Sequence, residues 1–118
     1  MNVYQVAITD SFYYPVPPQI RPLSFPSRSS VGSSVAIMCS TSSATQPLTF
    51  QWFKDGQKIS SSASFDIVVS KMSSTLEIGR VEESHDGNYT CLVTNSFGSD
   101  SSTARLEVEG EFWLVIYY

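Results

Sequence analysis

Apolar and polar residues alternate along several short stretches of the chain, which places every second side chain on the same face of a β-strand. Val35, Ile37 and Cys39 share one such face, whereas Ala36 and Met38 share the other. Helical runs of Leu, Glu, Lys and Ala are missing, and serine-rich turns separate the stretches, so the pattern predicts an all-β chain. The other alternating stretches are Leu48, Phe50 and Trp52; Phe65, Ile67 and Val69; Leu76 and Ile78; and Ala104, Leu106 and Val108.

Turn-forming residues separate these strands. Asp55 and Gly56 lie between two apolar residues and predict a tight hairpin. Ser73 and Ser74 predict a turn within a second hairpin. Polar loops are expected over residues 40–46 and 60–64.

A first edge strand is expected over residues 20–25. Pro22 interrupts it and Pro26 ends it, which an edge strand tolerates because one row of its amides has no partner strand. The preceding prolines at 15, 17 and 18 predict an extended, stiff lead-in.

Residues 85–91, which read HDGNYTC, carry the strongest local pattern. Tyr89 and Cys91 are two apart, so both enter the core if either does. Gly87 and Asn88 form a turn-prone pair that suits the bend where the chain crosses between sheets.

The chain has two cysteines, Cys39 and Cys91, far apart and without C-x-x-C spacing. Such a pair fits one structural disulfide, which in turn indicates an oxidising compartment.

A length of 118 residues fits one domain, and the formal net charge is −4. A nucleic-acid partner is disfavoured because it needs a basic stripe. No run of about 20 apolar residues is present, so no membrane contact is expected from this domain. Residues 1–14 lack the basic start and apolar centre of a secretory signal. We therefore expect a piece of a secreted or membrane-anchored ectodomain.

The boundaries follow from composition. Residues 1–16 are expected to be an N-terminal extension, 17–109 the domain, and 110–118 an apolar C-terminal tail. Each end is either native or an expression remnant, and no function is assigned to either.

The order and spacing of Cys39, Trp52, the LEIGRV segment and GNYTC resemble an I-set immunoglobulin domain. The resemblance implies a Greek-key β-sandwich with an inter-sheet Cys39–Cys91 disulfide. Trp52 is expected to pack on that disulfide, Leu76 to belong to the core signature, and the Tyr89 hydroxyl to bond upstream backbone as a tyrosine corner.

Within this group the chain is similar to the Dscam family of arthropod adhesion receptors. The residues that carry the similarity are PPQIRPLSFP at 17–26, QPLTFQWFKDG at 46–56, and HDGNYTC. The similarity is greatest to the seventh domain and to the first variable domain of the short chelicerate forms. It implies isoform-specific homophilic binding, as an antiparallel homodimer between cells, within an extracellular receptor that has neighbouring domains. The alternatives are a structural spacer and a heterophilic immune-recognition domain.

Catalysis finds little support, because the chain has one histidine and no serine elbow, and no cofactor is expected. His85 could ligate a metal only with Glu82, Glu83 or Asp86. We expect no metal site and interpret His85 as a corner residue whose side chain caps local backbone amides.

Asn88, Tyr89 and Thr90 form an N-glycosylation sequon, which would make the protein a glycoprotein. Alternatively, GNYTC is the corner sequence of the fold and contains the sequon by accident. Asn88 and Thr90 are expected to point outward in either case, because Tyr89 and Cys91 point inward.

Alternation also predicts which residues face solvent on each sheet. The sheet of the first, second, fourth and fifth strands gives the homophilic candidates Arg21, Ala36, Met38, Asp66, Val68, Lys71, Thr75 and Glu77. The opposite sheet presents Asn88 and Thr90, and its alternative interface residues are Gln51, Phe53 and Leu92. The family resemblance favours the first face, and a glycan on Asn88 would hinder the second.

Overall fold

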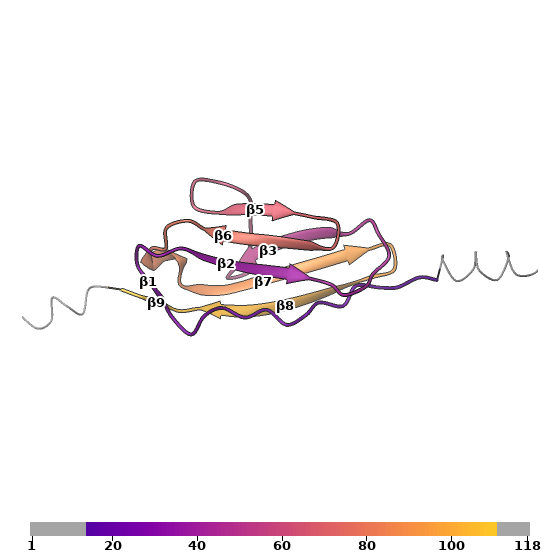
Figure 1. Ribbon diagram of the computed structural model, residues 1–118, viewed down its shortest axis with the longest axis horizontal. Coiled ribbons are helices and arrows are strands. Elements are labelled where there is room, and N and C mark those ends of the chain that lie inside the picture. The colour runs from indigo at the N-terminus through magenta and orange to yellow at the C-terminus, as the bar shows by residue number, and fades with distance from the viewer. Residues whose placement is uncertain (1–13, 111–118) are drawn as a thin grey trace, which may run out of the picture.

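The computed structural model describes residues 14–110, which form an elongated β-sandwich (Figure 1). Most of the expected terminal extension and tail lies outside the described residues. Within 14–110 no helix is long and apolar enough to span a membrane. The elements are β1 (Ser29–Ser30), β2 (Val35–Ser40), β3 (Thr49–Lys54), β4 (Gln57–Ile59), β5 (Asp66–Val69), β6 (Ser73–Ile78), the 3-10 turn η1 (Glu83–His85), β7 (Gly87–Asn95), β8 (Gly98–Leu106) and β9 (Val108–Glu109).

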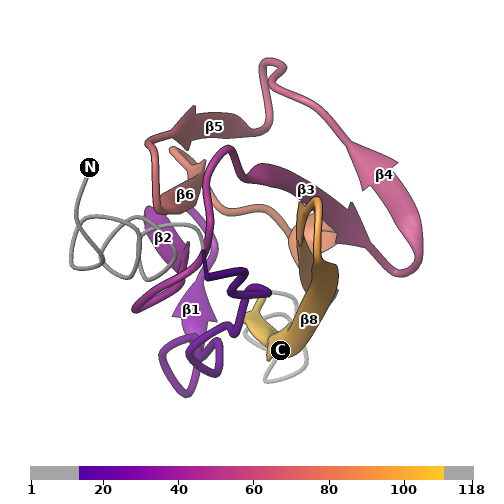
Figure 2. The ribbon, with the colours of Figure 1, turned by 90° about the vertical axis from the view of Figure 1, so that its right-hand side faces the viewer.

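Two antiparallel sheets form the sandwich, and the view along its length separates them (Figure 2). One sheet has the strand order β2-β6-β5 and the other β4-β3-β7-β8. A short parallel pair joins β1 to β9. The all-β immunoglobulin-like prediction is therefore confirmed.

The alternating residues of both sheets form a single core. Cys39 and Cys91 are fully buried and joined by a disulfide that links β2 to β7 across the sandwich. Trp52 is the register partner of Cys91 on β7, Leu76 is the partner of Ile37 on β2, and both are 1% exposed. Leu48 and Phe50 pack against this core while half-buried.

The expected strand over residues 20–25 is wrong. This segment forms only an isolated bridge between Ile20 and Thr41. Instead it runs between the sheets, where the Ile20 amide donates to Asp100 Oδ2 at 2.7 Å and the Leu23 amide donates to Ser102 Oγ at 3.1 Å. Pro22 has no amide to extend a ladder, and side-chain acceptors on β8 replace the strand partner.

The Asp55 and Gly56 hairpin is confirmed between β3 and β4. Asp55 has φ of 49° and Gly56 φ of 85°, the positive values that a two-residue hairpin turn of this type requires.

The turn predicted at Ser73 and Ser74 lies too late in the chain. Both residues belong to β6, and the Ser70 amide donates to the Ser73 carbonyl to close the turn before it. Val69, the register partner of the buried Ser74, keeps its place on the inward side of β5 but is 58% exposed, because it lies at the end of the strand.

Candidate interaction surface

The outer face of β2, β6 and β5 carries two rows of side chains that run across the strands, one near the middle of the strands and the other closer to one end. Met38, Thr75 and Val68 form the middle row in the register of the three strands. Ala36, Glu77 and Asp66 form a second row, two residues along, or roughly 7 Å away. Both rows point away from the core, as the alternation predicts. We call this surface the β2–β6–β5 face.

The middle row is apolar at both of its ends. Met38 is 59% exposed and Val68 is 50% exposed, on either side of the half-buried Thr75. Few large apolar side chains in the described part of the chain are as exposed, and these two share one face. Single exposed apolar residues are ordinary, but two in one row form an apolar surface that a partner can bury.

The second row is acidic. Asp66 and Glu77 are direct cross-strand partners, an arrangement in which like charges are unfavourable. They line a hollow of about 310 Å³ together with Ser34 and Ala36. Neither carboxylate forms an ion pair with any residue in the described range. The hollow is therefore suited to an incoming cation.

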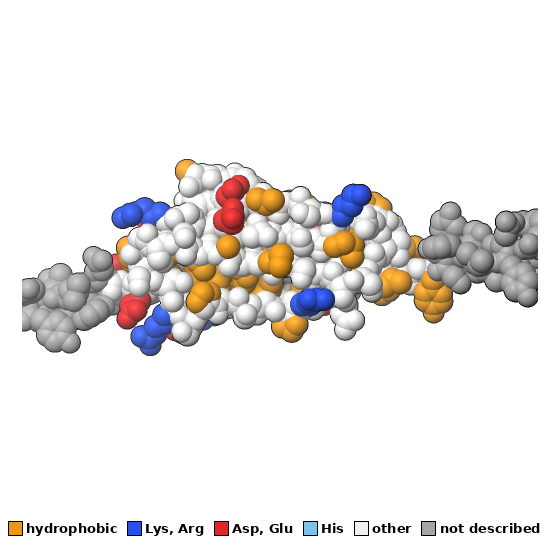
Figure 3. All heavy atoms as spheres, in the orientation of Figure 1, with side chains coloured by type: hydrophobic (Ala, Val, Ile, Leu, Met, Phe, Trp, Pro, Cys, Tyr) orange, Lys and Arg blue, Asp and Glu red, His pale blue; other side chains and the backbone are white. Residues whose placement is uncertain are grey.

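Basic side chains lie toward the opposite end of this face. Lys71 lies in the turn between β5 and β6, and Arg21 is held there because its amide donates to the Ser40 carbonyl at the end of β2. Both are exposed, and neither has an ion-pair partner among residues 14–110. Arg80 lies past the acidic row, beside Gly32. Figure 3 shows acidic side chains with hydrophobic side chains beside them, and basic side chains toward both ends of the view.

The β2–β6–β5 face is thus polarised along its strands. From Asp66 and Glu77, with Arg80 beyond them, it passes through the apolar middle row to Arg21 and Lys71 at the other end. A two-fold axis through the middle row would place each acidic end on a basic end of the partner.

The opposite sheet offers a less exposed apolar surface. Gln51, Phe53 and Leu92 lie on its outer face and are all half-buried. On this face the hydroxyl groups of Thr90 and Thr103 form a hydrogen bond with each other at 2.7 Å. Asn88 is exposed on the same face. A partner would gain less apolar burial here than on the β2–β6–β5 face.

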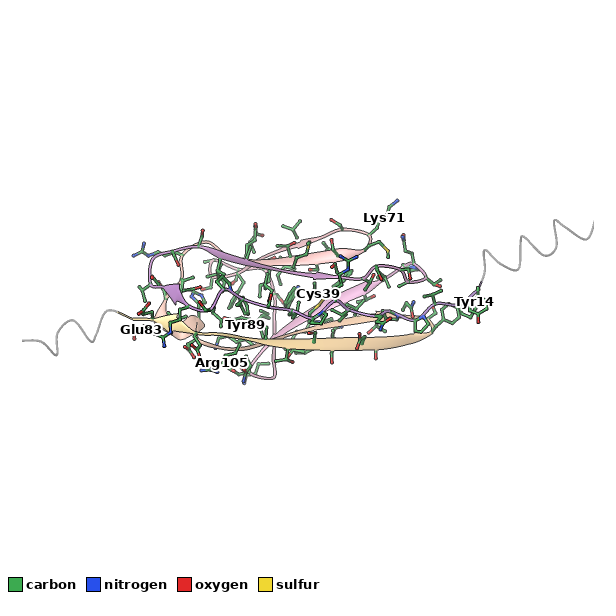
Figure 4. All side chains as sticks on the ribbon, turned by 60° about the horizontal axis from the view of Figure 1, so that its bottom comes forward. Tyr14, Cys39, Lys71, Glu83, Tyr89 and Arg105 are labelled. Atoms are coloured by element: carbon green, nitrogen blue, oxygen red, sulfur yellow. A yellow bond between two sulfur atoms is a disulfide. The ribbon has the colours of Figure 1, made fainter. Side chains whose placement is uncertain are left out.

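The tyrosine corner lies at the far end of the domain from Tyr14 (Figure 4). The Tyr89 hydroxyl donates to the His85 carbonyl at 2.7 Å, as the resemblance implied. The ring is fully buried, and its burial raises the pKa of Tyr89 well above the usual range. This corner fixes η1 onto the sandwich and exposes no reactive group.

His85 caps backbone in the way expected from its position. Its Nδ1 accepts the Glu82 amide at 2.9 Å, so Nδ1 carries no proton in this bond. The side chain is 4% exposed and its ring meets Phe65 edge-on, with centroids 5.4 Å apart. Burial lowers the pKa of His85 below its ordinary value of 6.5, against an opposing effect of the Glu82 charge. No group of three His, Cys, Asp or Glu side chains suited to a metal occurs within residues 14–110.

The lowered pKa of His85 predicts a pH-dependent stability. The unfolded chain binds a proton at a higher pH than the folded chain, so the His85 contribution is complete above pH ~6.5 and declines as pH falls toward the folded pKa. Replacement by asparagine keeps an acceptor without titration. Urea denaturation at a series of pH values should therefore show a decline below pH ~6.5 that is smaller in His85→Asn. Equal slopes in the two proteins would contradict this assignment.

Ser74 is a core residue, although the Ser73 and Ser74 pair predicts a turn at this place. It is fully buried, and its Oγ accepts the Trp52 indole N–H at 2.9 Å, which links β6 to β3 across the core. Its position two residues before Leu76 was the available signal, because residues 74, 76 and 78 share one face.

Comparison with known proteins places these features in a family context. A model of the immunoglobulin I-set domain matches residues 18–108. The cell adhesion molecule DSCAML1 of Mus musculus is 37% identical over 106 residues, which cover 88% of this chain but 5% of that protein. The crystal structure of the Dscam1 Ig7 domain, isoform 5, superimposes with a TM-score of 0.77 at 29% identity, covering 81% of this chain and all of that one. For isoform 9 the values are 0.75 and 32%, covering 79% of this chain and all of that one.

Proposed function

Because the chain belongs to the immunoglobulin I-set family, we propose that it is a cell-adhesion domain that binds a second copy of itself through the β2–β6–β5 face. The polarity of that face carries the proposal. Its acidic row, apolar middle row and basic end are self-complementary when a second copy is turned by 180°, and none of its four principal charges has an ion-pair partner within residues 14–110.

The proposed dimer is antiparallel. Met38 and Val68 of each copy lie near the axis and are covered by the same residues of the partner. Lys71 or Arg21 of one copy reaches the acid-lined hollow of the other, which relieves the repulsion between Asp66 and Glu77. Antiparallel pairing suits adhesion between cells, because the two copies then enter from opposite directions.

The proposal extends to isoform specificity within a cell-surface receptor. The likeness to the Dscam1 Ig7 domain in two isoforms supports a receptor with variants at this domain, and the DSCAML1 match supports an extracellular, non-catalytic role. A variant with a changed charge would place like charges in contact in a mixed pair, which lowers its affinity. The match covers only 5% of DSCAML1, which supports the proposal that this domain has neighbouring domains in its own receptor.

Charge exchange tests the antiparallel arrangement. Glu77→Lys alone and Lys71→Glu alone should each weaken self-association about tenfold, because each homodimer then contains two like-charge contacts. An equimolar mixture of the two variants should recover association, because both contacts in the mixed pair become attractive. Sedimentation velocity of each variant and of the mixture measures this effect.

Arg28→Glu provides a control that changes the same charge outside this face, where Arg28 lies near Glu107 and Glu109. It should leave association unchanged and fail to complement Glu77→Lys. A mixture that associates no better than its components would contradict antiparallel pairing. A wild-type domain that stays monomeric at high concentration and does not aggregate beads would instead support the spacer alternative.

A further inference from the structure

Asn88 is the second residue of β7, an inner strand of the four-stranded sheet, and is exposed on the outer face. Its backbone amide donates to Asp55 Oδ1 at 3.0 Å and its carbonyl accepts the Asp55 amide at 2.8 Å. No hydrogen bond engages its side-chain amide among the residues that the structure describes. The sequon residues Tyr89 and Thr90 follow it, Tyr89 buried and Thr90 on the same outer face.

From this placement we infer that Asn88 is an N-glycosylation site whose glycan is attached before β7 enters the sheet. The acceptor side chain can carry a bulky group without disturbing the core, because it points away from Tyr89 and Cys91. The disulfide indicates the oxidising route along which such a modification takes place. Glycosylation of Asn88 does not depend on whether the domain binds a second copy of itself.

The attachment joins Asn88 Nδ2 to the anomeric carbon of the first sugar of a polyprenyl-diphosphate-linked oligosaccharide. The bond between that carbon and the diphosphate oxygen breaks, the diphosphate leaves with the electron pair, and Nδ2 loses one proton to a base of the transferase. No oxidation or reduction is involved.

The order of events follows from the folded geometry. In the folded domain β3 and β8 flank the sequon on both sides. The Thr90 hydroxyl bonds Thr103 Oγ1 at 2.7 Å, and both backbone groups of Asn88 are held by Asp55. A transferase that must hold the three residues as a separate peptide therefore has access only to the unfolded chain.

The glycan would cover the outer face of the four-stranded sheet. Asn88 is the register partner of Arg105, and Thr90 is the partner of both Phe53 and Thr103, so the attachment point is close to the alternative interface. The β2–β6–β5 face is on the other side of the sandwich and stays uncovered.

Peptide mass spectrometry of the chain secreted from eukaryotic cells tests the site. The Asn88 peptide should carry a hexosamine-containing mass that peptide N-glycosidase removes. Thr90→Val should abolish it by removing the sequon while keeping the side-chain shape, and Thr90→Ser should retain it. An unmodified Asn88 peptide in the secreted wild-type protein would overturn the inference.

An acceptor assay tests the order. Non-glycosylated chain from bacteria is offered to purified oligosaccharyltransferase and its lipid-linked donor, either folded with the disulfide closed or reduced, alkylated and unfolded. Only the unfolded chain should gain the glycan, by at least tenfold over the folded form. Equal modification of both forms would overturn the order, and modification of neither would overturn the site. Sedimentation of the non-glycosylated chain reports self-binding separately.

Discussion

Replacing Met38 and Val68 together with glutamate is expected to abolish self-association. Both side chains are half or more exposed and lie in the row through which we place the two-fold axis. Each dimer would then bury four carboxylates without partners, next to the existing pair of Asp66 and Glu77. An unpaired buried charge costs several kcal/mol, so the loss in affinity should be at least about 100-fold, which sedimentation equilibrium and bead aggregation measure.

Val69→Glu is the matched control for this experiment. Val69 neighbours Val68 on the same strand and is 58% exposed, but its side chain belongs to the other side of β5. It should leave association unchanged. If the Met38 and Val68 double variant still dimerises like wild type, the interface moves to Phe53 and Leu92 on the opposite sheet.

Among the substitutions proposed here, removing the Cys39–Cys91 disulfide should lower the free energy of unfolding the most. Cys39 and Cys91 are separated by 52 residues, and a crosslink of that span lowers the entropy of the unfolded chain by an amount worth roughly 4 kcal/mol at 25 °C. Total stabilities of small domains are about 5–15 kcal/mol, so much of the margin depends on this bond. A Cys39→Ala and Cys91→Ala double variant introduces no polar atom at these fully buried positions.

Urea denaturation followed by circular dichroism gives the difference in the free energy of unfolding. Wild-type protein unfolded in reductant is the control, because it loses the same crosslink without a substitution. It should be destabilised by a similar amount. A loss below about 1 kcal/mol in both would contradict the role assigned to the disulfide.

The core was predictable from the sequence because it depends on a local rule. Ile37, Cys39, Trp52 and Leu76 occupy alternating positions on strands that bury one face, so their inward direction follows from position alone. The same rule correctly placed Ala36 and Met38 outside.

The first strand and the β5–β6 turn were mispredicted because tertiary acceptors decided them. The Ile20 amide is satisfied by Asp100, 80 residues away, which no local pattern around Pro22 indicates. The sequence around Ser74 predicts a turn, but its hydroxyl accepts a hydrogen bond from the Trp52 indole in the core.

The order of the charges along the β2–β6–β5 face does not follow from the sequence alone. Alternation identified Asp66 and Glu77 as outward residues but not as direct neighbours, since their pairing depends on the register of β5 with β6. The position of Arg21 at the other end depends on a backbone bond to Ser40. Both the strand register and this backbone hydrogen bond are set only when the chain folds.

The distance between two spin labels at position 75 tests the central proposal most directly. Both native cysteines are bridged, so a single Thr75→Cys substitution gives one label per copy, in the centre of the β2–β6–β5 face. Sheets pack about 10 Å apart, so double electron–electron resonance of the dimer should give a separation below roughly 25 Å, and above roughly 30 Å for Ser101→Cys on the opposite sheet. Close labels at position 101 with distant labels at position 75 would contradict self-binding through the β2–β6–β5 face.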